Sequence, residues 1–387
     1  LYVHMAVLMN ECFFPKTDPY TAGLLSAFAF CSTYVFRPFG ALLFGYLGDH
    51  IGRKSTVILT TAMMAISCIV IAVVPVYAQI GIAASWIVTI CRAMQGMASM
   101  GEIVGAELYL TEVVKPPHQY PVVALIGLAA VVGSMLALAI ASITTMYGLD
   151  WRIAFWIGAL VALVGTVART KLRETPEFLE MKTRKQQPGY VEKKERHFKT
   201  AIAYLLIQCS WPVVFYFTYV YCGEILKHKF HYTTEQVIHH NFAVSMVQLL
   251  SVVISIFLSI KIYPLKILRV KLYLFTVLML SCPIWLDNVS HPIEIMMIQG
   301  LMMLLVIDSL PAIPIFFRHF PVTQRFTYSS LTFALSRALM YVVTSFGIVW
   351  LVNRWGNWGM LVLMIPVTIG YTFGLLHFES IDSQLKR

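Results

Sequence analysis

The chain has 387 residues, of which 58% are hydrophobic and only 12% are charged, and its mean hydropathy is +0.74. Soluble domains carry about a quarter of their residues as charges, so this composition excludes an ordinary soluble protein and predicts an integral, multi-pass membrane protein. The formal net charge of +10 would suit a nucleic-acid partner. In a membrane chain, however, such a charge more often reflects Lys and Arg gathered in cytoplasmic loops.

Apolar segments separated by charged or Pro- and Gly-rich breaks follow one another along the chain. A membrane helix needs about 20 apolar residues, and these breaks predict an all-α membrane protein with twelve transmembrane helices. The first begins at Leu1 without an initiator Met, so we expect that it lacks its upstream residues. The expected helices cover residues 1–14, 21–46, 55–77, 82–109, 120–145, 152–170, 200–222, 237–260, 268–286, 293–317, 327–351 and 357–377.

The longest polar interval divides the predicted helices into two sets of six. We therefore expect an N-terminal bundle over residues 1–169, a cytoplasmic linker over 170–199 and a C-terminal bundle over 200–387. The linker mixes acids with its bases and lacks interleaved aromatic residues, which excludes a nucleic-acid surface. A solvated loop that faces anionic lipid headgroups fits the composition better, so the lipid bilayer is an expected partner.

Basic residues also indicate the orientation, because short cytoplasmic loops are enriched in Lys and Arg. Alternate connections carry them, namely 49–54, 115–118, the linker, 261–271, 318–325 and the C-terminal end. These connections are therefore predicted to be cytoplasmic, with both termini on the same side. The connection over 224–236 is an exception, since it is basic but falls on the other side.

Residues 45–54 read GYLGDHIGRK and form a polar, glycine-rich segment between two apolar ones. They lack the GxxxxGK[ST] pattern of a phosphate loop and the strand that precedes it. Between antiparallel membrane helices, glycines permit close backbone approach and positive φ. Asp49 is expected to cap the following helix or to pair with Arg53. We interpret the segment as a contact that holds one packing of the helices.

This segment resembles the signature between helices 2 and 3 of the major facilitator superfamily, with His50 as the one departure. The matching residues are Gly45, Leu47, Gly48, Asp49, Gly52, Arg53 and Lys54. Further stretches, CRAMQGMASMGE, DWRIAFWIG and LRETPEF, resemble the metabolite:proton symporter group of that superfamily. Within that group the stretch CFFPKTDP, after the first predicted helix, most resembles the proline/betaine osmolyte type. The second half departs more: residues 261–271 lack the expected Gly and Asp, and Ala334 replaces the usual Asn.

The resemblance implies two pseudo-symmetric six-helix bundles, a bacterial inner-membrane location and a chain that works as a monomer without a cofactor. It also implies alternating access for a small polar metabolite or osmolyte, such as a zwitterion or an organic acid, with proton symport. An exporter or a proton-independent facilitator of the same fold remains open. A sensor that has lost transport also remains open, because the segment over 261–271 has decayed.

Ionisable side chains at bilayer depth are functional candidates, because burying them costs several kcal/mol unless they are paired or hydrated. In the fourth predicted helix, Gln95 and Glu102 point the same way, and Arg92 lies near that line. Arg92 is suited to attract a carboxylate and Glu102 to carry a proton, although structural ion pairs would explain both. The full set of substrate and proton-coupling candidates is Arg37, Arg92, Gln95, Glu102, Asp308 and Arg337.

Glu107 and Glu112, near the predicted cytoplasmic end of the same helix, are expected to join the contacts of Asp49 and Arg53. The gate residues are thus predicted to be Gly45, Gly48, Asp49, Gly52, Arg53, Lys54, Glu107 and Glu112. Asp308 lies beside Pro311 and Pro314, which free backbone carbonyls and permit bending. A pair between Asp308 and Arg337 is one hypothesis; separate packing roles are the other.

Other chemistry is weakly supported. The aromatic run over 211–221 suits a quaternary ammonium group by cation–π attraction, but a packing or interfacial surface explains it as well. Histidines between positions 228 and 240 have poor metal-ligand spacing, so no metal is expected. The sequence contains no GxSxG or HExxH motif, and we expect that the protein is not an enzyme.

Overall fold

The computed structural model describes residues 9, 12–13, 34–187 and 197–385. All regular secondary structure within these residues is helical. Most of the first predicted helix and residues 188–196 of the predicted linker lie outside the described residues. Seven helical stretches of the described chain are long and apolar enough to cross a membrane: Arg53–Val73, Gln119–Ile140, Arg152–Thr170, Phe198–Phe230, Glu235–Lys261, Pro264–Asn288 and Arg325–Gln384.

The chain forms two compact units, and each contains segments from both halves of the sequence. The first unit comprises described residues within Leu1–Val113, Gly133–Val191 and Pro321–Ala334. In it, α4 packs along both α6 and α8, and α3 packs on α6. Its complete helices are α3 (Arg37–His50), α4 (Arg53–Val73), α5 (Tyr77–Ile80), α6 (Ile82–Val113), α8 (Arg152–Thr170) and α9 (Pro176–Lys185).

Small residues let these helices approach closely. A Cβ atom at Gly101 would lie 2.3 Å from the Thr60 methyl group of α4, and one at Gly105 would lie 2.9 Å from a methyl group of Val57. The small-xxx-small spacing of Gly101 and Gly105 thus lets α4 approach α6 closely. Near the far end of α4, Trp151 packs edge-on against Phe155 in an apolar core.

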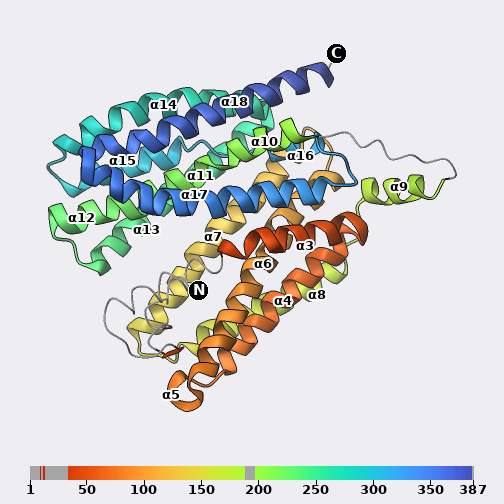
Figure 1. Ribbon diagram of the computed structural model, residues 1–387, viewed down its shortest axis with the longest axis horizontal. Helices are drawn as coiled ribbons and strands as arrows, with labels where there is room; N and C mark the ends of the chain where they lie inside the picture. The colour runs from red at the N-terminus through yellow and green to blue at the C-terminus, as the bar shows by residue number, and fades with distance from the viewer. Residues whose placement is uncertain (1–8, 10–11, 14–33, 188–196, 386–387) are drawn as a thin grey trace. The chain divides into compact units, whose positions relative to one another are not determined.

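The second unit comprises described residues within Val114–Val132, Glu192–Phe320 and Leu335–Arg387. Figure 1 shows α10 running beside α18, and α14 also packs on α18. By sequence, α7 (Gln119–Met146) begins in this unit and ends in the first, whereas α17 (Arg325–Trp355) does the reverse. The remaining helices are α10 (Phe198–Gln208), α11 (Ser210–Tyr216), α12 (Cys222–Phe230), α13 (Thr234–Lys261), α14 (Pro264–Asn288), α15 (Pro292–Leu304), α16 (Ile313–Arg318) and α18 (Leu361–Leu385).

The tenth predicted helix, 293–317, is broken. Helix α15 ends at Leu304 and α16 begins at Ile313, so residues 305–312 are not helical. The carbonyl oxygens freed there are bound by neighbouring side chains: the Ser210 hydroxyl donates to Ile307 at 2.6 Å and the Tyr371 hydroxyl donates to Asp308 at 2.7 Å. The sequence predicts a bend at Pro311 and Pro314, and the structure shows a full interruption.

Candidate functional site

The glycine-rich segment 45–54 is more helical than the sequence predicts. Helix α3 continues to His50 and α4 begins at Arg53, so Ile51 and Gly52 alone form the turn. Gly52 has φ 136°, a conformation that other residues rarely adopt. The carboxylate of Glu174 accepts the backbone N–H groups of Arg53 and Lys54 at 3.0 and 3.3 Å. The cap of α4 is therefore Glu174. Of the two roles expected for Asp49, capping this helix is wrong, whereas the pairing with Arg53 is present.

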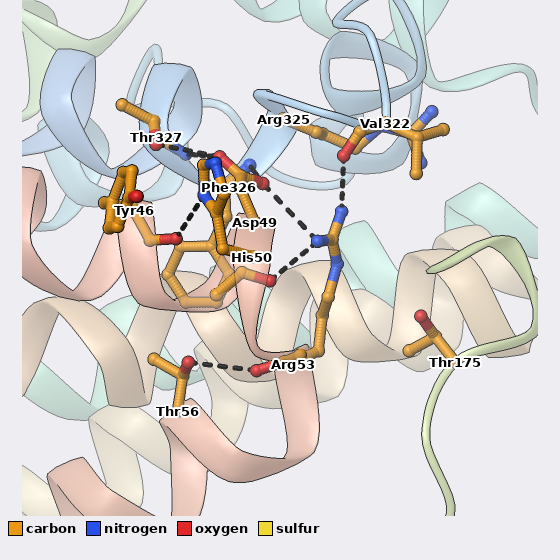
Figure 2. Close-up of polar contacts among 12 residues, drawn as sticks. Tyr46, Asp49, His50, Arg53, Thr56, Thr175, Val322, Arg325, Phe326 and Thr327 are labelled. Atoms are coloured by element: carbon orange, nitrogen blue, oxygen red, sulfur yellow. Dashed lines mark hydrogen bonds and ion pairs between the residues drawn. The ribbon is translucent and has the colours of Figure 1, made fainter. Parts of the chain in front are cut away.

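Asp49 instead caps the start of α17, which lies far away in the sequence. Its carboxylate accepts the backbone N–H groups of Phe326 and Thr327 at 3.0 and 2.9 Å, and the Thr327 hydroxyl at 2.8 Å. Figure 2 shows Asp49 beside these residues, with Arg53 on its other side at 3.4 Å. A carboxylate at a helix N-terminus is stabilised by the orphan N–H groups and by the helix dipole.

Two glycines make this approach possible. A Cβ atom on Gly48 would lie 2.4 Å from the Phe326 ring, and one on Gly45 would lie 2.8 Å from the Thr327 Cα atom. Real Cβ atoms do not come so close to a neighbour. Any other residue at these positions would therefore push the start of α17 away from α3.

Arg53 lies at the centre of the polar contacts and is completely buried. Its guanidinium donates to both carboxylate oxygens of Glu112 at 3.1 Å. It also donates to the carbonyl oxygen of Gly48 at 2.7 Å. A further bond runs to the carbonyl oxygen of Val322 at 2.8 Å (Figure 2). The ring of Phe178 lies 5.0 Å from the guanidinium and covers it. Bidentate pairing and full use of its donors compensate for the burial of this charge.

Glu112 binds a second arginine as well. Arg325, the first residue of α17, donates to Glu112 at 3.1 Å and also pairs with Glu177. The Thr175 hydroxyl donates to Glu112 at 2.6 Å. We call the residues Asp49, Arg53, Glu112, Glu174 and Arg325 the Asp49 cluster; it joins α3, α4, α6 and the stretch before α9 to the start of α17.

Burial dominates the electrostatics of Asp49. It raises the pKa of the carboxyl to about 6, against the lowering effects of Arg53 and of the hydrogen bonds from Thr327 and Phe326. A hydrated aspartate has a pKa near 3.9. The cluster therefore binds a proton on Asp49 more readily than an open, hydrated state would.

The predicted gate residues are largely brought together. Gly45, Gly48, Asp49, Gly52, Arg53 and Lys54 line the contact, and Glu112 supplies its central carboxylate. Glu107 is buried earlier in α6, and the carboxylate that binds Arg53 and Arg325 belongs to Glu112. The sequence analysis did not predict the roles of Glu174, Thr175, Glu177 and Phe178, all of which lie in the LRETPEF stretch. No local pattern shows which loop the two glutamates of this stretch contact.

The intramembrane candidates of the first unit lie mainly around α6. Glu102 accepts from Arg169 of α8 at 3.0 Å, and Arg169 also donates to Thr61 of α4. Gln95 donates to the Cys68 sulfur of α4 at 3.7 Å, so Gln95 faces α4, while Glu102 faces Arg169 of the neighbouring α8. Arg92 is buried in α6, and Arg37 stacks on Tyr34 with its guanidinium carbon 4.5 Å from the ring centroid.

In the second unit, Asp308 pairs with a residue that the sequence had placed in the connection over 261–271. Lys271 lies in α14, and its Nζ is 3.9 Å from Asp308 Oδ1. Arg337, the partner proposed from sequence, donates to the backbone and side-chain oxygens of Gln208 at 2.7 and 3.1 Å. The structure thus favours Lys271 as the ion-pair partner of Asp308.

A second polar cluster occupies one end of the second unit. The Tyr263 hydroxyl donates to Asp382 at 2.5 Å, and Arg318 lies 3.6 Å from the same carboxylate. Arg318 also donates to the hydroxyl of Tyr120, from α7, at 3.1 Å. His319 lies 3.8 Å from Asp382, and burial is the main reason that its pKa falls to about 4. We call these five residues the Asp382 cluster.

Comparison with known proteins places this geometry in a family. The family model described as Major Facilitator Superfamily matches residues 16–310. The proline/betaine transporter of Salmonella typhimurium is 26% identical over 253 residues, covering 61% of this chain and 51% of that protein. A Haemophilus influenzae protein, named as a candidate metabolite transport protein, is 29% identical over 368 residues, covering 87% of this chain and 82% of that protein.

Solved structures agree on the fold. The proton:xylose symporter XylE, solved with a bromodeoxyglucose, superposes with a TM-score of 0.74 at 15% identity, covering 98% of this chain and 91% of that chain. These matches confirm the predicted family resemblance and fold class, and the transporter names agree with the expectation that the protein is not an enzyme. The chain spans about half the length of the first curated relatives it matches, 51% for the Salmonella protein. The count of twelve helices stays a prediction.

Proposed function

Because the chain belongs to the major facilitator superfamily, we propose that it is a secondary active transporter that moves a small polar metabolite or osmolyte by alternating access with proton symport. Zwitterions and organic acids are the proposed solutes, in line with relatives named as proline/betaine and citrate-proton transporters. The proposed setting is a bacterial inner membrane, with both termini cytoplasmic and the monomer as the working unit.

The observation that carries the proposal is the Asp49 cluster. It joins the segment between α3 and α4, predicted to be cytoplasmic, to the start of α17 through bonds to Asp49, Arg53 and Glu112. These contacts are directional, buried and few, so they define a discrete closed arrangement. Opening the cytoplasmic side would break the bonds to residues 322–327 together, which is the two-state behaviour that alternating access needs.

Proton coupling needs a carboxylate whose protonation and solute occupancy act together. Glu102 and Asp308 are the proposed carboxylates, since each faces a basic partner at predicted bilayer depth. Arg92, Gln95, Arg337 and Arg37 are the proposed solute-facing candidates. The proposed organisation is two six-helix bundles, 1–169 and 200–387, joined by the linker 170–199.

Uptake into proteoliposomes tests the function directly. With an imposed proton gradient, acidic outside, we expect accumulation of a labelled zwitterion or organic acid above its external concentration, and loss of accumulation when a protonophore is added. Of the two proposed carboxylates, the one that couples is identified by its variant, Glu102→Gln or Asp308→Asn, losing the pH dependence, with the exposed Glu224→Gln as a matched control. Accumulation that ignores the proton gradient would favour a facilitator, and efflux driven by an opposite gradient an exporter. Absence of flux for every solute would favour a sensor.

A further inference from the structure

The ion pair at the broken helix of the second unit has unusual geometry. Lys271 Nζ and Asp308 Oδ1 are 3.9 Å apart, beyond hydrogen-bond distance. Oδ1 is buried, and within the described chain it accepts no hydrogen bond. The two side chains keep 11% and 14% of their surface exposed, so the pair is not sealed inside the helices. A buried acceptor without a donor, beside a cation that it does not hydrogen-bond, points to an exchangeable contact.

The groups around the Lys271–Asp308 pair determine the net charge of the site. Arg337 of α17 and Tyr371 of α18 also face Asp308; Tyr371 donates to the Asp308 backbone carbonyl. Arg337 is held by the two oxygens of Gln208, whose amide donates to the Ser309 hydroxyl at 3.4 Å. The Cys209 thiol lies beside Arg337. Within the described chain, Asp308 is therefore the single carboxylate among these groups. It faces two cations, Lys271 and Arg337.

We propose that a carboxylate of the solute replaces Asp308 beside Lys271, and that the displaced Asp308 takes up one proton from water. This inference rests on the proposed transport function and assigns its coupling site. It makes Lys271 the group that selects carboxylate-bearing solutes, and the non-helical segment 305–312 the part that lets Asp308 move.

Charge balance explains why the two ligands bind together. The empty pair is neutral. Proton binding alone leaves Lys271 as an uncompensated cation, and solute binding alone leaves Asp308 without its partner; each unpaired charge costs several kcal/mol at this depth. With both ligands bound, Lys271 faces the solute carboxylate and Asp308 is neutral, so balance returns. Arg337 adds a constant positive charge, which attracts the anion and opposes the proton, so the carboxylate enters first.

Binding measurements on the full chain in detergent test this site without requiring flux. The probes are proline, glycine betaine and citrate, with prolinamide and choline as counterparts that lack a carboxylate. We expect the wild type to bind a carboxylate probe and to take up about one proton per molecule in weak buffer. The amide and choline should neither bind comparably nor cause proton uptake.

Variants assign the two roles. Asp308→Asn should bind carboxylates without proton uptake, and Lys271→Gln should bind them about tenfold more weakly or worse. Lys266→Gln on the exposed face of α14 and Asp287→Asn at its end are matched controls that should behave as wild type. If Lys271→Gln fails to fold, the double variant Asp308→Asn/Lys271→Gln removes both charges and should show neither carboxylate preference nor proton uptake.

Four results would overturn the inference: no binding of any carboxylate probe, no proton uptake by the wild type, uptake that survives Asp308→Asn, or unchanged carboxylate preference without Lys271. A protein that binds with proton uptake but moves no solute would refute the proposed function and leave this site intact. A protein that transports but takes up no proton on binding would refute this site alone.

Discussion

The Asp49 cluster and the Asp382 cluster solve the same structural problem with different chemistry. Each fixes a connection between helices to a helix contributed by the other half of the sequence: α17 in the first unit, α7 in the second. The first uses glycines, two arginines and several carboxylates, with Arg53 fully buried. The second uses two tyrosines, one arginine, one histidine and a single carboxylate.

The difference shows that a connection can lose its sequence motif and still make a polar contact. Residues 261–271 lack the Gly and Asp of the first-half segment, but Tyr263 reaches Asp382 and Arg318 from the same place. The tyrosine hydroxyl is a neutral donor that takes the place of a buried charge. This avoids the cost of desolvating an ion. We infer that the first cluster is the more strongly two-state contact and the second the weaker one.

The largest expected effect comes from removing the central carboxylate. Glu112→Gln leaves Arg53 and Arg325 without their shared partner, and breaking a buried ion pair costs about 3–5 kcal/mol. We expect a large drop in the melting temperature of the detergent-solubilised protein. Glu224→Gln, in a half-exposed pair with Lys227, should change stability by less than about 1 kcal/mol. Equal effects of the two variants would remove Glu112 from the centre of the cluster.

The close approach of α3 to α17 can be broken by one methyl group. Gly48→Ala places a Cβ atom against the Phe326 ring, and overpacking of this kind costs about 1–3 kcal/mol. Gly133→Ala on α7 meets nothing within 4 Å and should be neutral or mildly stabilising. Hydrogen exchange over residues 322–330 should quicken in the first variant and stay unchanged in the second. Unchanged exchange in both would show that α17 does not depend on this glycine.

Acid should act on the two clusters in opposite directions. Asp49 has a raised pKa of about 6, so lowering the pH from 6 towards 4 favours its closed, proton-binding state. His319 has a lowered pKa of about 4, so its cluster is stable above pH 6.5 and is weakened as the pH falls through the same window. Each effect approaches about tenfold per pH unit at most.

Hydrogen exchange corrected for intrinsic rates checks this contrast. Protection over residues 322–330 should rise on acidification, while protection over 262–268 should fall. Asp49→Asn should abolish the first response and His319→Gln the second. Parallel changes in both segments would show that one general unfolding event, not the two titrating groups, governs the pH dependence.

The smallest effect is expected in the Asp382 cluster. Tyr263→Phe removes the hydroxyl that binds Asp382 and Arg318, which should cost about 1 kcal/mol. Tyr273→Phe, on the exposed face of α14, which begins directly after Tyr263, is the matched control and should change stability very little. A larger loss in Tyr263→Phe than in Glu112→Gln would reverse the ranking of the two clusters.

Sequence reasoning reached the fold and three of the five residues of the Asp49 cluster, namely Asp49, Arg53 and Glu112. Hydrophobic length and the segment 45–54 were sufficient for the family, because they are local signals. The partners of Asp49 and Glu112 lie on α17 and in the LRETPEF stretch, and contacts over such separations leave no local pattern. Lys271 fell in both the predicted helix 268–286 and the basic connection 261–271 and was counted with the cytoplasmic residues, whereas α14 begins earlier, at Pro264. The pairing of Asp308 depends on that register.

The central claim is that Asp49 holds the start of α17 in the closed arrangement, and thiol labelling tests it most directly. Ser330 is completely buried and donates to the Ala41 carbonyl of α3 at 3.1 Å, so Ser330→Cys should label slowly with N-ethylmaleimide. In Asp49→Asn the side-chain NH2 group faces a backbone N–H, and two donors cannot bond to each other. A protonated Asp49 keeps a lone pair on each oxygen and can still accept. Asp49→Asn should therefore speed labelling at position 330 about tenfold. Equal labelling rates in folded protein with and without Asp49→Asn would contradict the account.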